Sequence, residues 1–163
     1  MIKNESTLDK EIQISALTLE KLKKRLYRFF ELEPEWTDTR QPGWNEEQFC
    51  RELPCKWELS FVAEINDLIV GYVIGSQDKD DKNKSRVNKI VIDRNYHRKG
   101  ISKKLMCQYL EASVEQGMNR SELTAMSDYT PANKLYISLG YRKTSVAEGK
   151  DGETRNIYVK EIE

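Results

Sequence analysis

The sequence predicts an α/β (α+β) fold with a mixed, mostly antiparallel central sheet and helices on both faces. Two observations predict it. Pairs of strand-like segments joined by short turns occur before and after the middle of the chain, as in β-hairpins. Between these pairs a strand, a long helix and another strand follow one another, a crossover that places two strands parallel. The order is β-α-α-β-β-β-α-β-α-β-β, and 163 residues with 38% hydrophobic content fit one domain, residues 1–163, with a buried core.

The first half of the chain contains two helix caps and one hairpin turn. Thr18 and Asn45 each precede a helical pattern, and both residue types accept hydrogen bonds from a helix N-terminus. The Asn-Asp pair at 66–67 separates two alternating segments, and Gly71 and Gly75 in the second segment indicate a bulge or a close approach by a neighbour. The elements predicted here are a strand at 11–16, helices at 19–32 and 45–53, and hairpin strands at 57–65 and 68–74.

The second half of the chain predicts the crossover and a final hairpin. Gly117 suits the left-handed position that closes a helix. Pro131 suits the first turn of a later helix, which either Thr130 or Asp128 would cap. The elements predicted here are strands at 86–93 and 121–126, helices at 101–116 and 131–139, and hairpin strands at 141–147 and 154–162.

The composition argues against several functional classes. Lys plus Arg and Asp plus Glu are balanced at 27 each, so no global field would collect nucleic acid or an anionic membrane. No apolar run approaches the roughly 20 residues of a membrane span, and the polar N-terminus does not resemble a signal peptide. Three cysteines without a CxxC pair and a single histidine do not indicate a metal site or a Ser–His–Asp hydrolase. We expect reduced thiols and a cytoplasmic protein.

The segment from Ile90 to Met106 has the pattern of a phosphate-binding site. Residues 90–92 are β-branched and predict a strand, a basic loop follows, and Gly100 directly precedes a helical pattern. A helix N-terminus carries unpartnered N–H groups and partial positive charge, and glycine lets the backbone approach an anion. Additional attraction comes from four basic side chains, Arg98, Lys99, Lys103 and Lys104. The same pattern also fits a solvated basic helix start after a core strand.

Two motifs in the second half are specific in combination. The first is His-Arg-Lys-Gly-Ile-Ser at 97–102, and the second is Tyr-Thr-Pro-Ala at 129–132, followed by Tyr136 and the Gly-Tyr pair at 140–141. With the element order, they resemble the pyrophosphate loop Q/R-x-x-G-x-G/A and the segment N-x-x-A, Tyr, G-F/Y of the GNAT superfamily of acyl-CoA-dependent N-acetyltransferases. The resemblance covers about residues 57–160.

The resemblance implies a GNAT-like fold, acetyl-CoA as cosubstrate without a metal, and direct attack of an amine on the acetyl group. His97 replaces the usual Gln or Arg, and Ser102 replaces the usual Gly or Ala, but both still present backbone N–H groups. Tyr129 replaces the usual asparagine, and Asn133 is expected to supply the missing contact. The coenzyme-binding residues implied in this way are Ile90, Val91, Ile92, His97, Arg98, Lys99, Gly100, Ile101, Ser102, Lys103, Asn133 and Tyr136.

The resemblance also implies catalytic roles. By position, Tyr136 is expected to be the general acid that protonates the coenzyme A sulfur, although a tyrosine packed in the core is the alternative. The general base is expected to be Glu122, two residues before the aligned position, Thr124. Glu64 and a chain of water molecules are the alternatives for this role.

The acceptor is expected to bind near the loop at 31–44, which is irregular and aromatic, as functional loops often are. The residues expected to contact it are Trp36, Asp38, Trp44 and Tyr72. Glu33 and Glu35 would attract an ammonium group, whereas simple packing of the tryptophans on the core is the alternative. The expected partner is a small-molecule or protein amine, and a homodimer is left open. Besides an N-acetyltransferase, a non-catalytic acyl-CoA-binding regulatory module or another phosphate binder fits the sequence.

Overall fold

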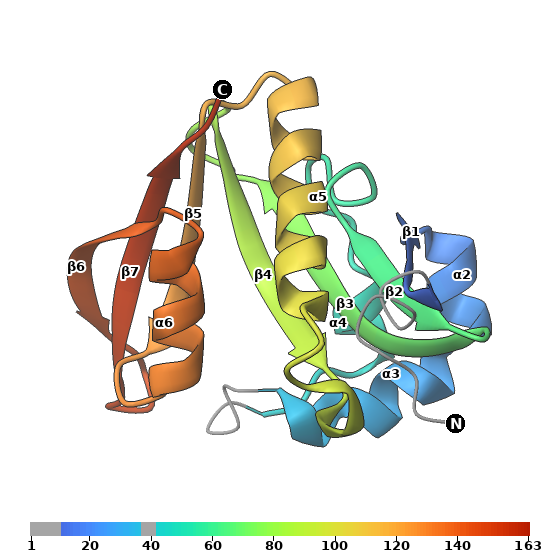
Figure 1. The fold of residues 1–163 in the computed structure, drawn as a ribbon. Coiled ribbons are helices and arrows are strands. Elements are labelled where there is room, and N and C mark those ends of the chain that lie inside the picture. The colour runs from blue at the N-terminus through green and yellow to red at the C-terminus, as the bar shows by residue number, and fades with distance from the viewer. Residues whose placement is uncertain (1–10, 37–41) are drawn as a thin grey trace.

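The computed structural model describes residues 11–36 and 42–163, and its centre is one seven-stranded sheet. The strand order is β1-β2-β3-β4-β5-β7-β6, and every neighbouring pair is antiparallel except β4 and β5, which are parallel (Figure 1). The predicted mixed, mostly antiparallel sheet is confirmed. The strands are β1 (Gln13–Ala16), β2 (Phe61–Ile65), β3 (Leu68–Gln77), β4 (Lys84–Ile92), β5 (Arg120–Met126), β6 (Arg142–Glu148) and β7 (Thr154–Glu161). The helices are α2 (Leu19–Lys24), α3 (Leu26–Leu32), α4 (Glu46–Cys50), α5 (Ile101–Glu115) and α6 (Thr130–Ser138), with short 3₁₀ turns η1 (Glu33–Glu35) and η2 (Arg94–Tyr96).

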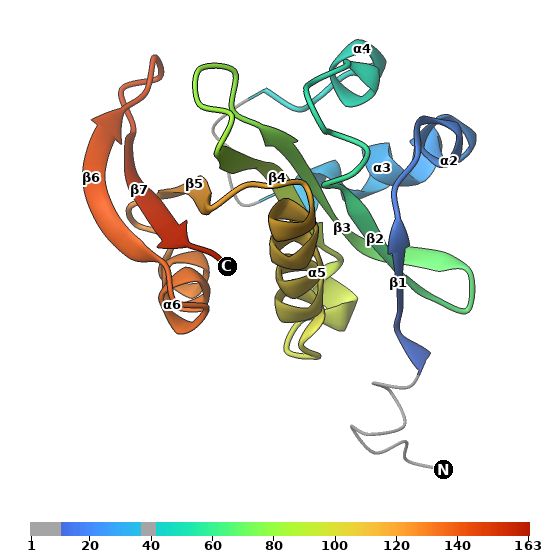
Figure 2. The same ribbon diagram turned by 90° about the horizontal axis from the view of Figure 1, so that it is seen from above.

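Helices cover both faces of the sheet, as predicted (Figure 2). Helices α5 and α6 lie on one face, and α2, α3 and α4 lie on the other. The core under α5 includes Leu105 and Tyr109, and the opposite core includes Phe29, Phe49 and Tyr72, all of them fully buried. Burying side chains of this size stabilises the fold by roughly 1.5–3 kcal/mol each. The central strands are therefore held from both sides.

The first predicted helix is in fact two helices, α2 and α3, separated at Arg25. Thr18 caps α2 by accepting a hydrogen bond from the N–H of Lys21 at 3.1 Å, as predicted. The N–H of Arg25 bonds to the carbonyls of Lys21 and Leu22 in the pattern of a helix end. Leu22 and Phe29 are both fully buried, so the break lets each piece turn its apolar side toward the sheet.

The first hairpin strand begins at Phe61, four residues later than predicted, and α4 ends at Cys50 instead of residue 53. Both differences have one cause, the buried side chain of Lys56. Its ammonium donates to the carbonyls of Phe49 at 2.6 Å and Arg51 at 2.7 Å. These bonds satisfy carbonyls at the helix end and draw residues 54–59 into turns.

The parallel strands β4 and β5 are paired at one end and parted at the other (Figure 1). Their last pair in register is Arg86 with Glu122. Beyond this pair the register between β3 and β4 shifts. Gly75 pairs with Val87 and Ile74 with Lys89, so Asn88 is an extra residue between them in β4. Such a bulge bends a strand and increases its twist. The bulge therefore lies where β4 leaves β5.

The two glycines of β3 confirm the predicted close approach. A Cβ atom on Gly75 would lie 2.7 Å from the ring of Tyr109 and 2.8 Å from the carbonyl oxygen of Leu59. A Cβ atom on Gly71 would lie 2.7 Å from Cδ1 of Ile92. Helix α5 and strand β4 can therefore pack directly on β3 only because these positions have no side chain.

A buried hydroxyl cluster holds β4 and β5 together at their paired end. The Tyr109 hydroxyl lies 2.8 Å from Ser85 Oγ on β4 and 2.8 Å from Ser121 Oγ on β5. Ser113 donates to Ser85 at 3.0 Å, and Ser121 lies 2.7 Å from the Tyr141 hydroxyl. All five residues are buried, where hydrogen bonds are electrostatically stronger than in water. The cluster fixes the point from which the two strands separate.

Candidate active site

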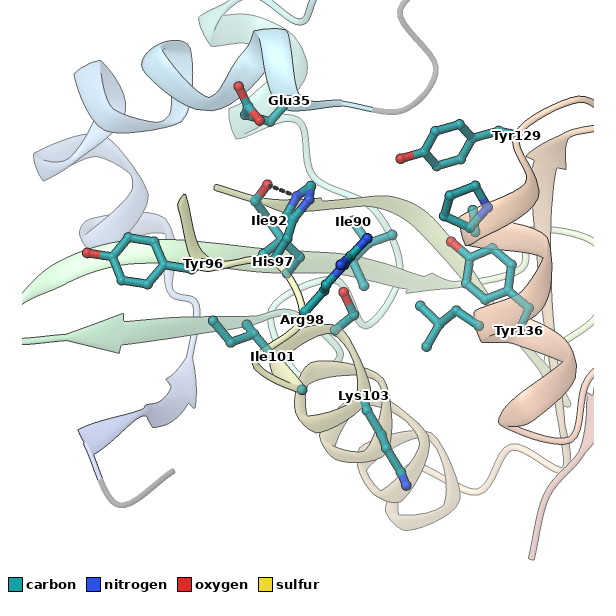
Figure 3. A pocket seen from close by; sticks show the side chains of 15 residues that line it. Glu35, Ile90, Ile92, Tyr96, His97, Arg98, Ile101, Lys103, Tyr129 and Tyr136 are labelled. Atoms are coloured by element: carbon teal, nitrogen blue, oxygen red, sulfur yellow. Dashed lines mark hydrogen bonds between the residues drawn. The ribbon is translucent and has the colours of Figure 1, made fainter. Parts of the chain in front are cut away.

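A cleft of about 530 Å³ lies between the start of α5 and helix α6, on the open side of the parted strands (Figure 3). We name it the α5–α6 cleft. The predicted coenzyme-binding residues that line it are Ile90, Ile92, His97, Arg98, Gly100, Ile101, Ser102, Lys103 and Tyr136. Val91, Lys99 and Asn133 are not among its lining residues. Val91 instead packs in the opposite core.

The start of α5 has the geometry of an anion site. Gly100 is the N-cap of this 15-residue helix and has a left-handed backbone, with φ +78°. The first helical hydrogen bond runs from the N–H of Lys104 to the carbonyl of Gly100, so the N–H groups of the preceding three residues have no acceptor inside the helix. They point out of the helix N-terminus together with the positive end of its dipole. The chemistry of this turn suits a phosphate or pyrophosphate.

The main chain of β4 faces the gap between the parted strands. The N–H of Asp93 bonds to the carbonyl of Val70 on β3 at 2.8 Å. Because main-chain groups alternate in direction along a strand, those of Ile92 and Ile90 point the other way, toward β5. The Ile92 carbonyl indeed accepts a hydrogen bond of 3.1 Å from the ring of His97 (Figure 3). This edge can bond an extended, amide-containing ligand.

A second, smaller cavity of about 60 Å³ lies between the parted strands. We name it the split cavity. Ile90 and Tyr136 line both the split cavity and the α5–α6 cleft. Burial raises the pKa of the Tyr136 hydroxyl well above its ordinary value, so the group is a neutral phenol at physiological pH. It can donate a proton at the point where the two cavities meet.

The predicted acceptor residues lie on the opposite face and are only partly brought together. Trp36 lines the split cavity, and Trp44 lines a further cleft of about 390 Å³ beside α4, the α4 cleft. Asn88 lines both of these cavities. Tyr72 is fully buried in the core and lines neither, and Asp38 lies outside the described residues.

The two glutamates expected to attract an ammonium group are already paired. Glu33 accepts hydrogen bonds from the ammonium of Lys89 at 2.5 Å and from the N–H of Trp44 at 2.9 Å. Glu35 accepts from Arg94 at 2.8 Å. Neither carboxylate lines the split cavity. Their charge is used within the protein.

The carboxylates considered as the general base are also in ion pairs away from the split cavity. Glu122 lies 2.6 Å from the ammonium of Lys84, where β4 and β5 are still paired. Glu64 lies 2.5 Å from the ammonium of Lys21. Of the two aligned positions on β5, Thr124 lines the split cavity and Glu122 does not. The assignment of Glu122 as base does not fit this geometry.

The side chain of Asn133 is fully used inside the protein, which does not fit its expected coenzyme contact. Its amide nitrogen donates to the carbonyls of Met126 at 2.9 Å and Tyr129 at 2.7 Å. Its amide oxygen accepts from Asn156 at 3.0 Å and from the Tyr158 hydroxyl at 2.6 Å. These bonds order the turn before α6, whose N-cap is Tyr129 without a side-chain bond, instead of Thr130 or Asp128.

Sequence reasoning missed two cationic residues of the split cavity, Lys89 on β4 and Arg155 on β7. A signal for Lys89 was present, because it is the one charged residue in the otherwise uncharged segment 87–92. Arg155 carried no such signal, since it lies in a polar hairpin. Among the described residues, no group of three or more His, Cys, Asp or Glu could hold a metal ion, and no helix is long and apolar enough to cross a membrane.

Comparison with known proteins bears on this arrangement. The profile of the acetyltransferase (GNAT) family matches residues 23–141. A UPF0039 protein of Schizosaccharomyces pombe is 36% identical over 67 residues, which are 41% of this chain and 44% of that protein. The chain thus aligns with less than half the length of this curated relative.

Two solved structures illustrate the likeness in fold. The ribosomal-protein-S18-alanine N-acetyltransferase from Escherichia coli superposes with a TM-score of 0.75 at 20% identity, over 93% of this chain and 94% of that chain. Arabidopsis thaliana Naa50, in complex with the bisubstrate analogue CoA-Ac-MVNAL, gives a TM-score of 0.70 at 17% identity, over 93% and 99%. At these identities the likeness shows a shared fold.

Proposed function

The chain belongs to the acetyltransferase (GNAT) family, and on that premise we propose that it transfers an acetyl group from acetyl-CoA to a primary amine of a small molecule or a protein. One observation carries the proposal. The α5–α6 cleft and the split cavity share Ile90 and Tyr136 as lining residues. A thioester held in the cleft would therefore meet an amine held in the split cavity.

The residues of the α5–α6 cleft suit coenzyme A. The N–H groups at the start of α5, with Arg98, Ser102 and Lys103 around them, offer hydrogen bonds and positive charge to a pyrophosphate. The main chain of β4 offers partners to the amide groups of a pantetheine arm. An arm that bonds the carbonyl of Ile92 would replace the contact from His97.

The transfer then needs few protein groups. The amine nitrogen bonds to the acetyl carbonyl carbon, the carbon–sulfur bond breaks, and the sulfur takes the proton of the Tyr136 hydroxyl. The proton that the amine nitrogen loses then returns to Tyr136 and restores the phenol. A main-chain N–H of Ile90 is oriented to polarise the carbonyl, and one such donor contributes about 10²–10³ in rate. Tyr136 is suited to donate because its raised pKa keeps it protonated.

The test is thiol release from acetyl-CoA over a panel of amines, including peptides. Tyr136→Phe should lower kcat by about 10²–10⁴ and leave the Kd of coenzyme A unchanged. Tyr129→Phe is the matched control, because Tyr129 lines the same cleft but not the split cavity, and it should keep full activity.

Two results would contradict the proposal. Equal loss of activity in both tyrosine variants would show that Tyr136 acts only through packing. Tight binding of coenzyme A without turnover on any amine would favour a non-catalytic acyl-CoA-binding module.

A further inference from the structure

Lys89 is buried beside the split cavity. Its side chain is 0% exposed, and its ammonium lies 2.5 Å from a carboxylate oxygen of Glu33. The same ammonium lies over three aromatic rings, at 3.9 Å from the centroid of Trp36, 4.4 Å from that of Trp44 and 5.0 Å from that of Phe49. A carboxylate and three ring faces all stabilise a cation. These contacts hold the ammonium group in a fixed position.

The charged residues that line the split cavity are cationic. Lys89 lines this cavity, whereas Glu33 does not. The other ionisable side chains that line it are Arg155 and the neutral phenol Tyr136, so no carboxylate is among its lining residues in the described chain. An amine in the split cavity would therefore be surrounded by cationic and hydroxyl-bearing residues and by no carboxylate of the described chain, and the Lys89 ammonium would act on it from behind the cavity wall.

We propose, resting on the proposed function, that Lys89 makes the split cavity bind its acceptor amine in the neutral form, so that the site needs no carboxylate base. A like charge at short range disfavours an ammonium ion in a cavity with little water. The proton leaves for solvent as the amine enters. The acceptor nitrogen then carries the free electron pair that attack on the thioester requires.

This selection names a class of acceptor. An α-amino group has an ordinary pKa of about 7.7–8.0, whereas a lysine ε-amino group has one of about 10.4, so near pH 7 the neutral fraction of the α-amine is roughly 300-fold larger. A cavity that admits only the neutral form therefore favours the α-amine of a peptide or protein over a lysine side chain. Aliphatic polyamines are disfavoured for the same reason.

The groups around Lys89 define the pH range of the effect. Burial lowers the pKa of Lys89 to about 8, while the Glu33 carboxylate acts in the opposite direction. The ammonium is thus present below about pH 8 and is lost as the pH rises above that value. Three further titratable groups lie nearby. The Tyr72 hydroxyl lies 3.5 Å from Glu33, and burial raises the pKa of Tyr72. The other two, Arg155 and Tyr136, line the split cavity. Arg155 is itself held by Asp151 at 2.9 Å.

The test compares two inhibitors of the wild-type protein bound to coenzyme A. One is a short peptide whose α-amine is replaced by trimethylammonium, and the other carries the neutral tert-butyl isostere. The neutral peptide should bind at least roughly 10-fold more tightly, and Lys89→Met should reduce this preference while Lys89→Arg preserves it. The same two variants are then compared by the pH dependence of kcat with the unmodified peptide. The rise in kcat that accompanies deprotonation of the bound amine should shift to a higher pH, by about one unit, in Lys89→Met. It should not shift in Lys89→Arg.

The outcomes separate the hypotheses. Tighter binding of the trimethylammonium peptide would overturn the inference and reveal an aromatic cation site. Loss of activity in Lys89→Arg as complete as in Lys89→Met, with both variants folded and binding coenzyme A, would also overturn it, because Lys89 would then accept the proton itself. If no peptide or other amine is acetylated, the proposed function fails. If amines are acetylated but the preference and the kcat profile do not depend on Lys89, only this inference fails.

Discussion

At the scale of single residues, the proposed site uses mainly main-chain groups and one phenol. Tyr136 and the N–H of Ile90 lie where the two cavities meet, and the carboxylates of Glu33 and Glu122 are each bound to a lysine. In both cases a carboxylate oxygen is already bound to an ammonium group inside the protein. Residue type and spacing therefore suggested a candidate acid more readily than a candidate base.

Asn133 illustrates a residue whose role is structural. Replacing it with Ala leaves the hydroxyl of Tyr158 and the carbonyl of Met126 without their partner, and we expect a loss of about 2–3 kcal/mol in the free energy of unfolding. Urea denaturation measures this loss. Asn119→Ala is the control, because this side chain is exposed, and it should change stability by less than about 0.5 kcal/mol. The Kd of coenzyme A should not change in either variant. Weaker coenzyme binding by a stable Asn133→Ala protein would restore the original expectation of a direct contact.

At the scale of elements, α5 combines a core face with a binding end. Leu105 and Tyr109 pack against the sheet, and the N-terminal turn opens into the α5–α6 cleft. Packing therefore fixes the direction of the helix dipole relative to β4. A glycine at each end of α5 allows these two functions to be tested separately.

Gly100→Glu and Gly117→Glu form a matched pair. Both glycines have positive φ, +78° and +87°, and a Cβ atom at either meets nothing within 4 Å, so the strain of substitution is similar. Only Gly100 lies at the predicted pyrophosphate turn, where a carboxylate opposes the dipole and repels phosphate. Gly100→Glu should weaken coenzyme A binding by roughly 100-fold or more, and Gly117→Glu should not. Isothermal titration calorimetry decides, and equal losses would mean that both changes act through the stability of α5.

At the scale of the whole molecule, the separation of β4 from β5 is the feature that shapes the α5–α6 cleft. The hydroxyl cluster around Tyr109 and the bulge at Asn88 set where β4 leaves β5, and the two halves then line the α5–α6 cleft from different sides. A ligand that fills this cleft contacts both halves. Ligand binding and fold stability should therefore be linked.

Coenzyme A at about 100 times its Kd should stabilise the folded state by about 2.7 kcal/mol, which for a chain of this size is roughly 5–10 °C in Tm. ADP has the pyrophosphate but no pantetheine arm, so it contacts mainly the start of α5 and should raise Tm far less. Thermal unfolding at matched concentrations measures both shifts. An equal effect of ADP would point instead to a general phosphate binder.

From the sequence alone we could predict the fold class and name candidate coenzyme-binding residues. Hairpin turns, glycine positions and hydrophobic periods are local signals, and the loop at 97–102 is contiguous, so both are visible without long-range contacts. The family match and the observed sheet confirm the family and the fold class, whereas the coenzyme-binding residues stay a prediction. The errors of the prediction concern element bounds: one predicted helix is broken at Arg25, and β2 starts late where the buried Lys56 bonds to carbonyls at the end of α4.

The composition of the split cavity, the proposed acceptor side, is visible only in the folded molecule. The split cavity is lined by residues from different segments of the chain, which meet only in the folded sheet; among them are Trp36, Lys89, Thr124 and Arg155. Spacing along the chain also cannot show that Glu33 is paired with Lys89, 56 residues away. The electrostatic character of that cavity is therefore a property of the folded molecule, because it depends on which charges burial brings together.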